Sequence, residues 1–323
     1  MEIHLEGPLP FREGDTVDVG DVDVRNGDRV WFSRLDESSV AMRVVSVVAP
    51  AAEGVPVFEI SRGPGDVLNL TALRAEFEEH ERLQWSRNNA RVDDLARFYS
   101  LLRRLESGGS QGRPLADYTG YIEWPARGVY FFRESGETRR ESEELRVVRV
   151  GTHALHSGAA SKLWQRLRSH RGGVGGGGNH RGSILRQYVG DALLKKGGIT
   201  LPSWGNKTVG KEVLAGERDL EKAVSQYIGA MSVLWLEIDD EPGPTSDRAR
   251  IEEHAIGLLS GISAPLDPPS PTWLGLLSED AKIRDSGLWN KDYVFGEYDP
   301  RFLDVMEQHV HAHCQKMRRP SSG

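Results

Sequence analysis

Residues 127–171 read RGVYFFRESGETRRESEELRVVRVGTHALHSGAASKLWQRLRSHR, and the rest of the predicted fold is arranged around this stretch. Val129–Phe132 is a run of strand-forming residues, and Arg146–Val150 interleaves arginine with valine. The segment between them is polar and contains glycine, which is typical of a hairpin connection. We therefore predict two antiparallel strands.

A helix is predicted after the second strand, which ends at Gly151. Small residues lead into LWQRLRSHR, where Leu163 and Leu167 recur four residues apart as an apolar stripe. Arg166 and His170 have the same spacing on another face. Side chains four apart on a helix lie about 5–6 Å apart at Cβ, so a guanidinium and an imidazole could converge on one phosphate.

Two later elements complete the predicted core. Met231–Ile238 is apolar almost throughout, which predicts a buried strand. An acidic turn follows, and Ser246 or Asp247 can cap the next helix, which contains Glu252.

The predicted strands carry two triplets, Gly128-Val129-Tyr130 and Arg149-Val150-Gly151. At these residues the sequence resembles the GIY-YIG nuclease superfamily. The phrases WPARGVYFF, VVRVGTHAL and GGNHRGSILR are also similar to a bacterial group of stand-alone GIY-YIG proteins. The resemblance covers roughly residues 124–265, and the superfamily's closing Pro and Asn are matched weakly, by Pro265–Asp267 or by Asn290.

Further residues match the superfamily's pattern after the second triplet. Arg166 and His170 match the arginine and histidine of its next helix, and Glu252 matches its metal-binding glutamate, with Glu253 as the alternative. The resemblance implies an α+β fold, with a small antiparallel sheet flanked by helices, and phosphodiester hydrolysis that depends on Mg²⁺ or Mn²⁺. It also implies that Tyr130 positions or deprotonates the attacking water, that Arg166 clamps the scissile phosphate, and that His170 relays a proton or binds the phosphate.

Arg149 departs from the pattern, because the superfamily usually has tyrosine at this position. This arginine either contacts phosphate or is a solvated strand residue, and the sequence leaves both interpretations open. The predicted catalytic set is therefore Tyr130, Arg149, Arg166, His170 and Glu252, of which Glu252 would bind the metal.

The segment Leu145–Lys211 contains twelve lysines and arginines and one acidic residue, a net charge of +11. The whole chain has a net charge of −7, so the remaining residues carry −18. A positive surface centred on the helix of Arg166 is what contact with a phosphate backbone requires. The residues predicted to bind nucleic acid are Lys162, Arg168, Arg171, Asn179, His180, Arg181, Arg186, Lys195 and Lys196.

Composition restricts the class of protein further. A chain of 323 residues, 38% of them hydrophobic, can form about two domains with a real core. No apolar stretch approaches the ~18 residues of a membrane span, and the acidic start MEIHLEGPLPFREGD lacks the features of a signal peptide. The single cysteine excludes an internal disulfide and a multi-cysteine zinc site. We expect a cytoplasmic protein with no membrane partner.

Four regions are predicted along the chain. They are a β-rich module at 1–73, a helical linker at 74–119, a nuclease-like core at 120–265 with a basic, glycine-rich insertion at 172–211, and a C-terminal wrap and helix at 266–323. The β-rich module serves either packing and oligomerisation or target recognition. The glycine run in the insertion formally satisfies GxGxxG, but it follows a helix, whereas a dinucleotide fingerprint follows a strand.

These observations predict a metal-dependent DNA endonuclease of restriction, defence or repair type. Two alternatives remain open, a catalytically inactive nucleic-acid-binding module and an RNA-cleaving nuclease. Duplex DNA is the expected partner, and cutting both strands with one site per chain favours a homodimer.

Overall fold

The computed structural model of the chain divides into two compact units, Met1–Ala90 and Arg91–Gly323. It describes the backbone of residues 2–4, 16–18, 29–33, 39–48, 57–61, 70–108, 112–140, 142–262 and 265–318, and side chains within those ranges from 89 to 317. Helix α1 (Leu70–Ser107) begins in the first unit and ends in the second.

The described residues of the first unit include five strands in one sheet, in the order β1-β3-β4-β5-β2. Strand β1 is parallel to β3, and the other pairs are antiparallel. Apart from residues 70–73, which begin α1, the rest of the predicted module 1–73 lies outside the described residues, and the role of the module stays a prediction. The strands are β1 (Glu2–His4), β2 (Thr16–Asp18), β3 (Arg29–Ser33), β4 (Ser39–Val48) and β5 (Val57–Ser61).

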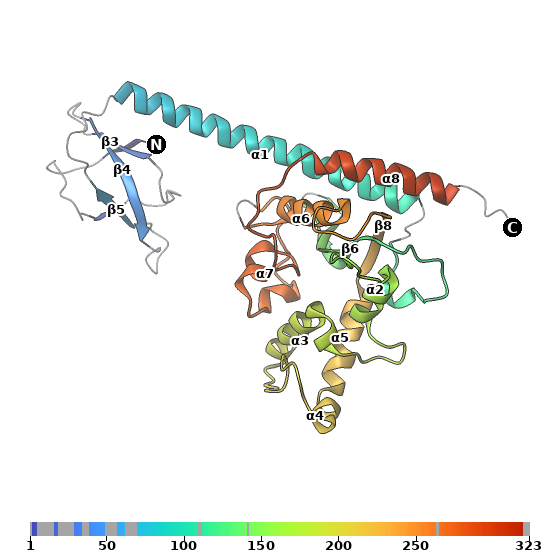
Figure 1. The fold of residues 1–323 in the computed structure, drawn as a ribbon. Helices are drawn as coiled ribbons and strands as arrows, with labels where there is room; N and C mark the ends of the chain where they lie inside the picture. The colour runs from blue at the N-terminus through green and yellow to red at the C-terminus, as the bar shows by residue number, and fades with distance from the viewer. Residues whose placement is uncertain are drawn as a thin grey trace. The chain divides into compact units, whose positions relative to one another are not determined.

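The second unit is built on a three-stranded antiparallel sheet in the order β7-β6-β8. Strands β6 and β8 are labelled in Figure 1. Central strand β6 (Gly128–Thr138) pairs with β7 (Leu145–Gly151) as the predicted hairpin and with β8 (Ser232–Glu237) on its other side. In this register Tyr130 lies opposite Gly151. The predicted α+β class is confirmed.

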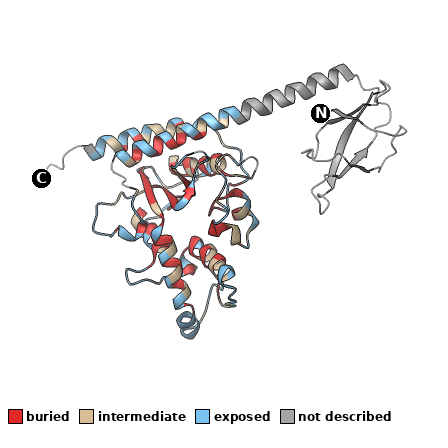
Figure 2. Ribbon diagram, turned by 180° about the vertical axis from the view of Figure 1, so that it is seen from behind, coloured by how far each residue is buried: buried red, intermediate tan, exposed pale blue. Residues whose placement is uncertain are grey.

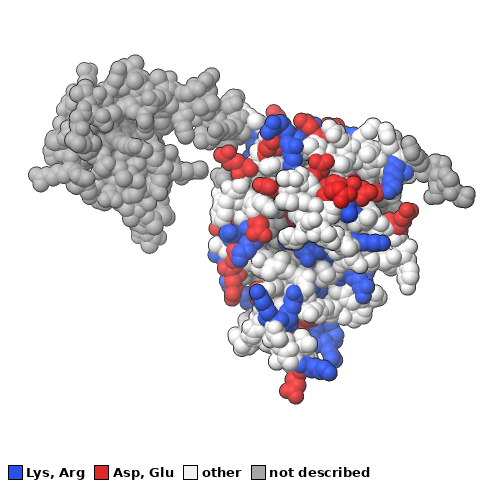
Figure 3. Space-filling model, in the orientation of Figure 1, with Lys and Arg blue, Asp and Glu red and all other residues white. Residues whose placement is uncertain are grey.

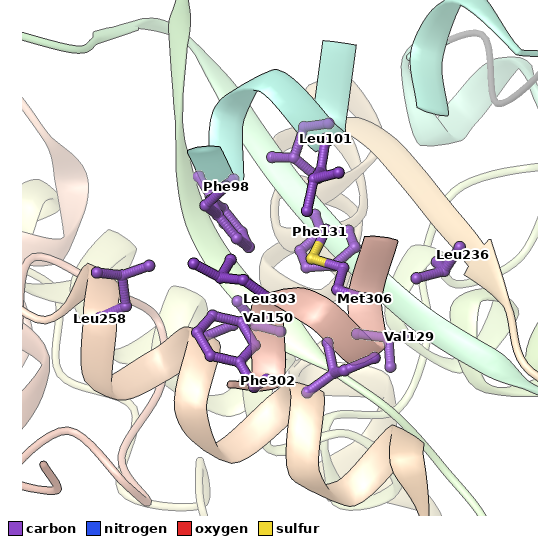
Figure 4. Packing of buried hydrophobic residues seen from close by; sticks show 14 of the residues in the cluster. Phe98, Leu101, Val129, Phe131, Val150, Leu236, Leu258, Phe302, Leu303 and Met306 are labelled. Atoms are coloured by element: carbon purple, nitrogen blue, oxygen red, sulfur yellow. The ribbon is translucent and has the colours of Figure 1, made fainter. Parts of the chain in front are cut away.

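Alternate side chains of β6 enter two separate cores, because successive residues of a strand point to opposite faces. Val129 and Phe131 join a cluster with α1, α6 (Asp247–Leu259) and α8 (Phe302–Arg318) (Figure 4). Tyr130 and Phe132 join a second cluster with α2 (Leu163–Arg171), α3 (Ile184–Gly197) and α5 (Arg218–Ala230). The buried residues accordingly line the sheet and the helix sides that face it (Figure 2).

The remaining elements of this unit are short. They include α4 (Lys211–Gly216) and α7 (Ala281–Ser286). Ser183 and Ser246 cap the N-termini of α3 and α6 through their side chains, so the cap predicted for the helix of Glu252 is Ser246. None of the helices in the described part of the chain combines the length and apolar character needed to cross a membrane.

Candidate active site

Both signature triplets contain a glycine that close packing requires. A Cβ on Gly151 would lie 2.3 Å from the hydroxyl oxygen of Tyr130, and one on Gly128 would lie 2.4 Å from the carbonyl oxygen of Leu236. Real Cβ atoms essentially never approach another atom closer than 3.0 Å. The ring of Tyr130 therefore lies directly against β7, where only a glycine leaves room for it.

Tyr130 is hydrogen bonded to His170, and neither residue has exposed surface. The hydroxyl oxygen of Tyr130 lies 2.8 Å from Nε2 of His170, and Nδ1 of the same ring lies 2.6 Å from Oγ of Ser183. Burial lowers the pKa of His170 well below its usual value, so the imidazole is neutral. With both ring nitrogens occupied inside the core, His170 has no atom to offer a phosphate, and of its two implied roles only that of proton relay fits.

Arg149 lies on β7 opposite Phe132, and only 6% of its surface is exposed. Its Nη1 donates to the carbonyl oxygen of Trp289, whereas its Nε is buried without a partner among the described residues. This burial excludes the interpretation of Arg149 as a solvated strand residue, which was one of the two that the sequence allowed.

Glu252 lies on α6 beside the end of β7. Its Oε1 accepts a hydrogen bond from the backbone N–H of Thr152 at 3.1 Å, and the side chain is half-buried. The end of β7 is itself held by Asn290, whose amide accepts from the N–H of Val150 at 3.0 Å and donates to its carbonyl at 2.9 Å. Glu253, the alternative glutamate, is exposed.

The charges of Arg149 and Arg166 act on both His170 and Glu252. Each guanidinium adds to the burial that lowers the pKa of His170. Burial raises the pKa of Glu252, and the same two guanidinium groups and the Thr152 N–H oppose that rise. The hydrogen bond between Tyr130 and His170 links Tyr130 to these four residues. All five predicted catalytic residues therefore lie at one end of the sheet.

Glu252 is the one predicted metal ligand, and its surroundings fit a hard cation held largely by water. Its Oε2 makes no hydrogen bond to any described residue, so one carboxylate oxygen is available. Within the described side chains, no group of three or more His, Cys, Asp or Glu residues is arranged to hold a metal ion. Among the predicted catalytic residues, Glu252 is the one that carries a carboxylate.

Several residues predicted to bind nucleic acid are committed to internal contacts. Arg186 is 0% exposed, and its guanidinium donates to the carboxylate of Glu221 and, at 2.9 Å, to the carbonyl oxygen of His170. His180 is 2% exposed and contacts Glu221 through Nδ1 at 2.9 Å. Both side chains are enclosed and paired with Glu221, so in this structure they connect α3 and the insertion to α5.

Three further members of that set, of which Asn179 is exposed, also make contacts within the protein. Arg181 forms a two-pronged ion pair with Glu217 at 2.7 and 2.9 Å. The side chain of Asn179 accepts from the N–H of Arg181 at 3.1 Å, and Arg171 donates to the carbonyl oxygen of Tyr118. The Arg181 contact connects the glycine-rich insertion to the start of α5, and the Arg171 contact connects the end of α2 to the segment that precedes β6.

The other four members, Lys162, Arg168, Lys195 and Lys196, are exposed. They lie at the start and on the outer face of α2 and at the end of α3. On the face shown in Figure 3, blue side chains predominate over the lower half, where Figure 1 places α2, α3 and α5. The exposed positive charge of this segment is therefore smaller than its full count of lysines and arginines.

Two residues beside the site did not enter the predicted set. Ser183 contacts His170, and Thr152 contacts Glu252. Ser183 precedes an apolar helix and so carries the sequence signal of an N-cap, but its contact with a residue of the preceding helix is tertiary. The bond from Thr152 uses the backbone, so no side-chain signal could have indicated it.

A family model described as GIY-YIG domain matches residues 89–316, and the chain therefore belongs to this family. Membership supports a nuclease-type function. Searches of curated proteins and of solved structures gave no match.

Proposed function

We propose that the protein is a metal-dependent DNA endonuclease that hydrolyses phosphodiester bonds. The observation that carries the proposal is the convergence of Tyr130, Arg149, Arg166, His170 and Glu252 at one end of the sheet. A hydrolytic phosphodiesterase needs a base for water, positive charge at the phosphorane-like transition state and stabilisation of the leaving oxygen.

Arg166 is the residue best placed to clamp the scissile phosphate. Its side chain is half-buried, and its guanidinium makes no hydrogen bond or ion pair with any described residue. A planar guanidinium can donate two parallel hydrogen bonds to phosphate oxygens. Arg149 adds a second positive charge from β7, with its Nε uncommitted.

Tyr130 is the residue proposed to position or deprotonate the attacking water. Its hydroxyl is fixed by His170, which sits in the core and can hold or pass a proton at Nε2. In the balanced reaction, water loses a proton as its oxygen bonds to phosphorus, the bond from phosphorus to the 3′ oxygen breaks, and that oxygen is protonated on release.

Glu252 would hold the divalent cation, Mg²⁺ or Mn²⁺, through its free carboxylate oxygen. Such a cation stabilises negative charge on the leaving oxygen. Because the carboxylate must be ionised to bind it, the raised pKa of Glu252 predicts that activity falls as the solution becomes acidic.

The remaining parts of the proposal concern substrate and assembly. The exposed lysines and arginine on α2 and α3 support binding along a DNA backbone. A homodimer would supply two sites for cutting both strands of a duplex. The single cysteine in the sequence fits a reducing, cytoplasmic environment.

The test is incubation of the purified chain with supercoiled plasmid and Mg²⁺, with Glu252→Ala, Arg166→Ala and the matched control Glu253→Ala. We expect nicking or linearisation by the wild type and by Glu253→Ala, and loss of at least 100-fold in rate for the other two, a range typical of removing a key electrostatic group. Omitting the metal should stop cleavage by every variant.

Other outcomes point to other functions. An inert wild type that binds DNA with a steep salt dependence would indicate a binding module without catalysis. Cleavage only of substrates that contain 2′-hydroxyl groups would indicate an RNA-cleaving nuclease. Glu252→Ala cutting as fast as the wild type would overturn the site assignment.

A further inference from the structure

Two exposed aromatic rings lie on the segment that follows Asn290, the residue that binds the end of β7. Tyr293 is 46% exposed and Phe295 is 66% exposed, whereas Val294 between them is 2% exposed and packs into the core. The chain therefore fixes the middle of this segment inside and leaves a flat ring exposed on either side of it. Two neighbouring exposed rings form a small apolar surface that is open to a ligand.

The segment that carries the rings is anchored at both ends. The side-chain amide of Asn290 forms hydrogen bonds of 3.0 and 2.9 Å with the backbone of Val150. At the other end, Oγ of Ser260, which follows α6, donates to the carbonyl oxygen of Val294 at 2.7 Å. Between these anchors Tyr293 has a φ of +64°, which a bulky residue rarely adopts. Such a backbone is kept only where the surrounding structure imposes it, and it occurs often at ligand-binding sites.

The same segment lies beside Glu252. The side chain of Asn290 accepts a hydrogen bond from the N–H of Val150. Glu252 accepts one from the N–H of Thr152, two residues further along the chain, so the two donor nitrogens are at most about 7 Å apart. Burial raises the pKa of Tyr293, and the charge of Glu252 adds to that rise, as expected of neighbouring groups. The ring of Tyr293 therefore borders the place proposed for the scissile phosphate.

The charges around Tyr293 favour an uncharged group over a phosphate. Three carboxylates act on this tyrosine and would repel a phosphate placed against its ring. They are those of Glu252, Glu253 and Asp292. A nucleobase is uncharged, and its flat face can stack on an aromatic ring. The ammonium group of Lys282 lies 5.3 Å from the centre of the Phe295 ring, so a positive charge is present there for the backbone that continues from the base.

We propose that Tyr293 and Phe295 form a stacking surface for an unpaired nucleobase next to the scissile phosphate. The rings hold the base while Arg166 holds the phosphate. The substrate strand is therefore unpaired where it meets the site, as in a single strand, a gap or a flap. This inference rests on the proposed nuclease function, and it adds a class of substrate that the two signature triplets do not specify.

The first experiment measures binding without cleavage. Fluorescence anisotropy of the full chain in EDTA compares a labelled single-stranded oligonucleotide with the same strand in a perfect duplex. We expect Tyr293→Leu and Phe295→Leu, which remove a flat ring, each to weaken single-strand binding about 10-fold and to leave duplex binding within about 2-fold, whereas Tyr293→Phe behaves like the wild type. Tyr121→Leu is the matched control, because Tyr121 is 99% exposed on the segment before β6 and should change neither affinity.

The outcomes separate this inference from the proposed function. Unchanged single-strand binding by both leucine variants, or an equal loss in Tyr121→Leu, would overturn the stacking surface and leave the nuclease proposal intact. A wild type that binds neither probe would contradict the nuclease proposal itself, and the stacking surface with it.

The second experiment separates ligand contact from a packing role of the Tyr293 ring. Glycine adopts a positive φ freely, so Tyr293→Gly relieves the backbone while it removes the ring. We expect this variant to melt at no lower temperature than the wild type and to lose single-strand affinity as Tyr293→Leu does. A melting temperature lower by more than about 4 °C would assign the ring to packing and refute the proposal.

Discussion

Replacing Gly151 by alanine tests whether the contact between Tyr130 and β7 shapes the candidate site. The new Cβ would lie 2.3, 2.4 and 2.8 Å from Oη, Cζ and Cε2 of Tyr130. Normal contact between carbon atoms is about 3.5–4.0 Å, so the ring must move by roughly 1 Å or more. That movement would break the 2.8 Å hydrogen bond to His170.

The expected cost combines overpacking with the lost hydrogen bond. Overpacking in a tight core costs about 1–3 kcal/mol, and a buried hydrogen bond contributes about 1 kcal/mol. Gly151→Ala should therefore lower the free energy of unfolding by about 2–4 kcal/mol, and plasmid nicking should fall with it. Gly243→Ala is the matched control, because a Cβ there meets nothing within 4 Å and its φ is not positive.

A double-mutant cycle shows whether the Tyr130 ring is the cause. Tyr130→Leu removes the three atoms that the new Cβ would meet while keeping an apolar side chain in the core. In that background Gly151→Ala should cost almost nothing, which gives a coupling energy of about 2–4 kcal/mol in denaturant melts. A cost that is equal in both backgrounds would refute the reasoning, because the strain would then lie in the backbone of β7.

Three further predictions concern charges around the site. Burial raises the pKa of Asp191 from 3.8 to about 6, so the native state binds the extra proton and stability falls as pH rises through that window. Asp191→Asn should therefore stabilise the protein by about 1 kcal/mol above pH 6, a value that allows for the partial exposure of the side chain. Below pH 3.8 the substitution should not change stability, and equal effects at both pH values would contradict this. Arg186→Leu should lower the free energy of unfolding by about 3–5 kcal/mol, because it leaves the carboxylate of Glu221 buried without its main partner, whereas the exposed control Lys195→Ala should stay within about 0.5 kcal/mol. Lys195→Ala should instead reduce the slope of log binding constant against log salt for duplex DNA by about 1, and an unchanged slope would remove α3 from the binding surface.

The elements around the site could be predicted because their signals are local. Strand-forming residues, an apolar stripe and a serine cap specify β6, β7, α2 and α6 from within each segment. Arg166 and His170 were expected on one helix face, and the structure places the second inward, towards Tyr130. The sequence alone could not predict that His170 is fully buried, because its burial depends on the packing of α3 and α5 against α2.

The glycine-rich run after α2 illustrates the same limit. Gly172, Gly176 and Gly177 adopt positive φ angles, which side chains rarely allow. The N–H of Gly173 donates to the carbonyl of Gly177 at 2.8 Å, so the run closes into a compact turn. A series of glycines is equally compatible with a flexible backbone and with a fixed backbone that has positive φ angles. Only the contacts with neighbouring residues decide between the two.

The buried cations show why a count of charges in the sequence does not give the exposed positive surface. In a sequence, Arg186 and Lys195 contribute equally to the positive segment, but one pairs with Glu221 in the core and the other is exposed. Glu221 lies beyond the segment Leu145–Lys211, so its compensation of the local charge was invisible in that window.

Arg149 connects the departure from the family pattern with the chemistry of the site. A tyrosine at this position would be neutral, whereas the arginine brings a fixed positive charge beside His170 and Glu252. That charge favours a neutral imidazole and an ionised carboxylate at the same time. The substitution therefore fits a site that relies on one tyrosine, supported by cations, better than it fits a site that has lost its function.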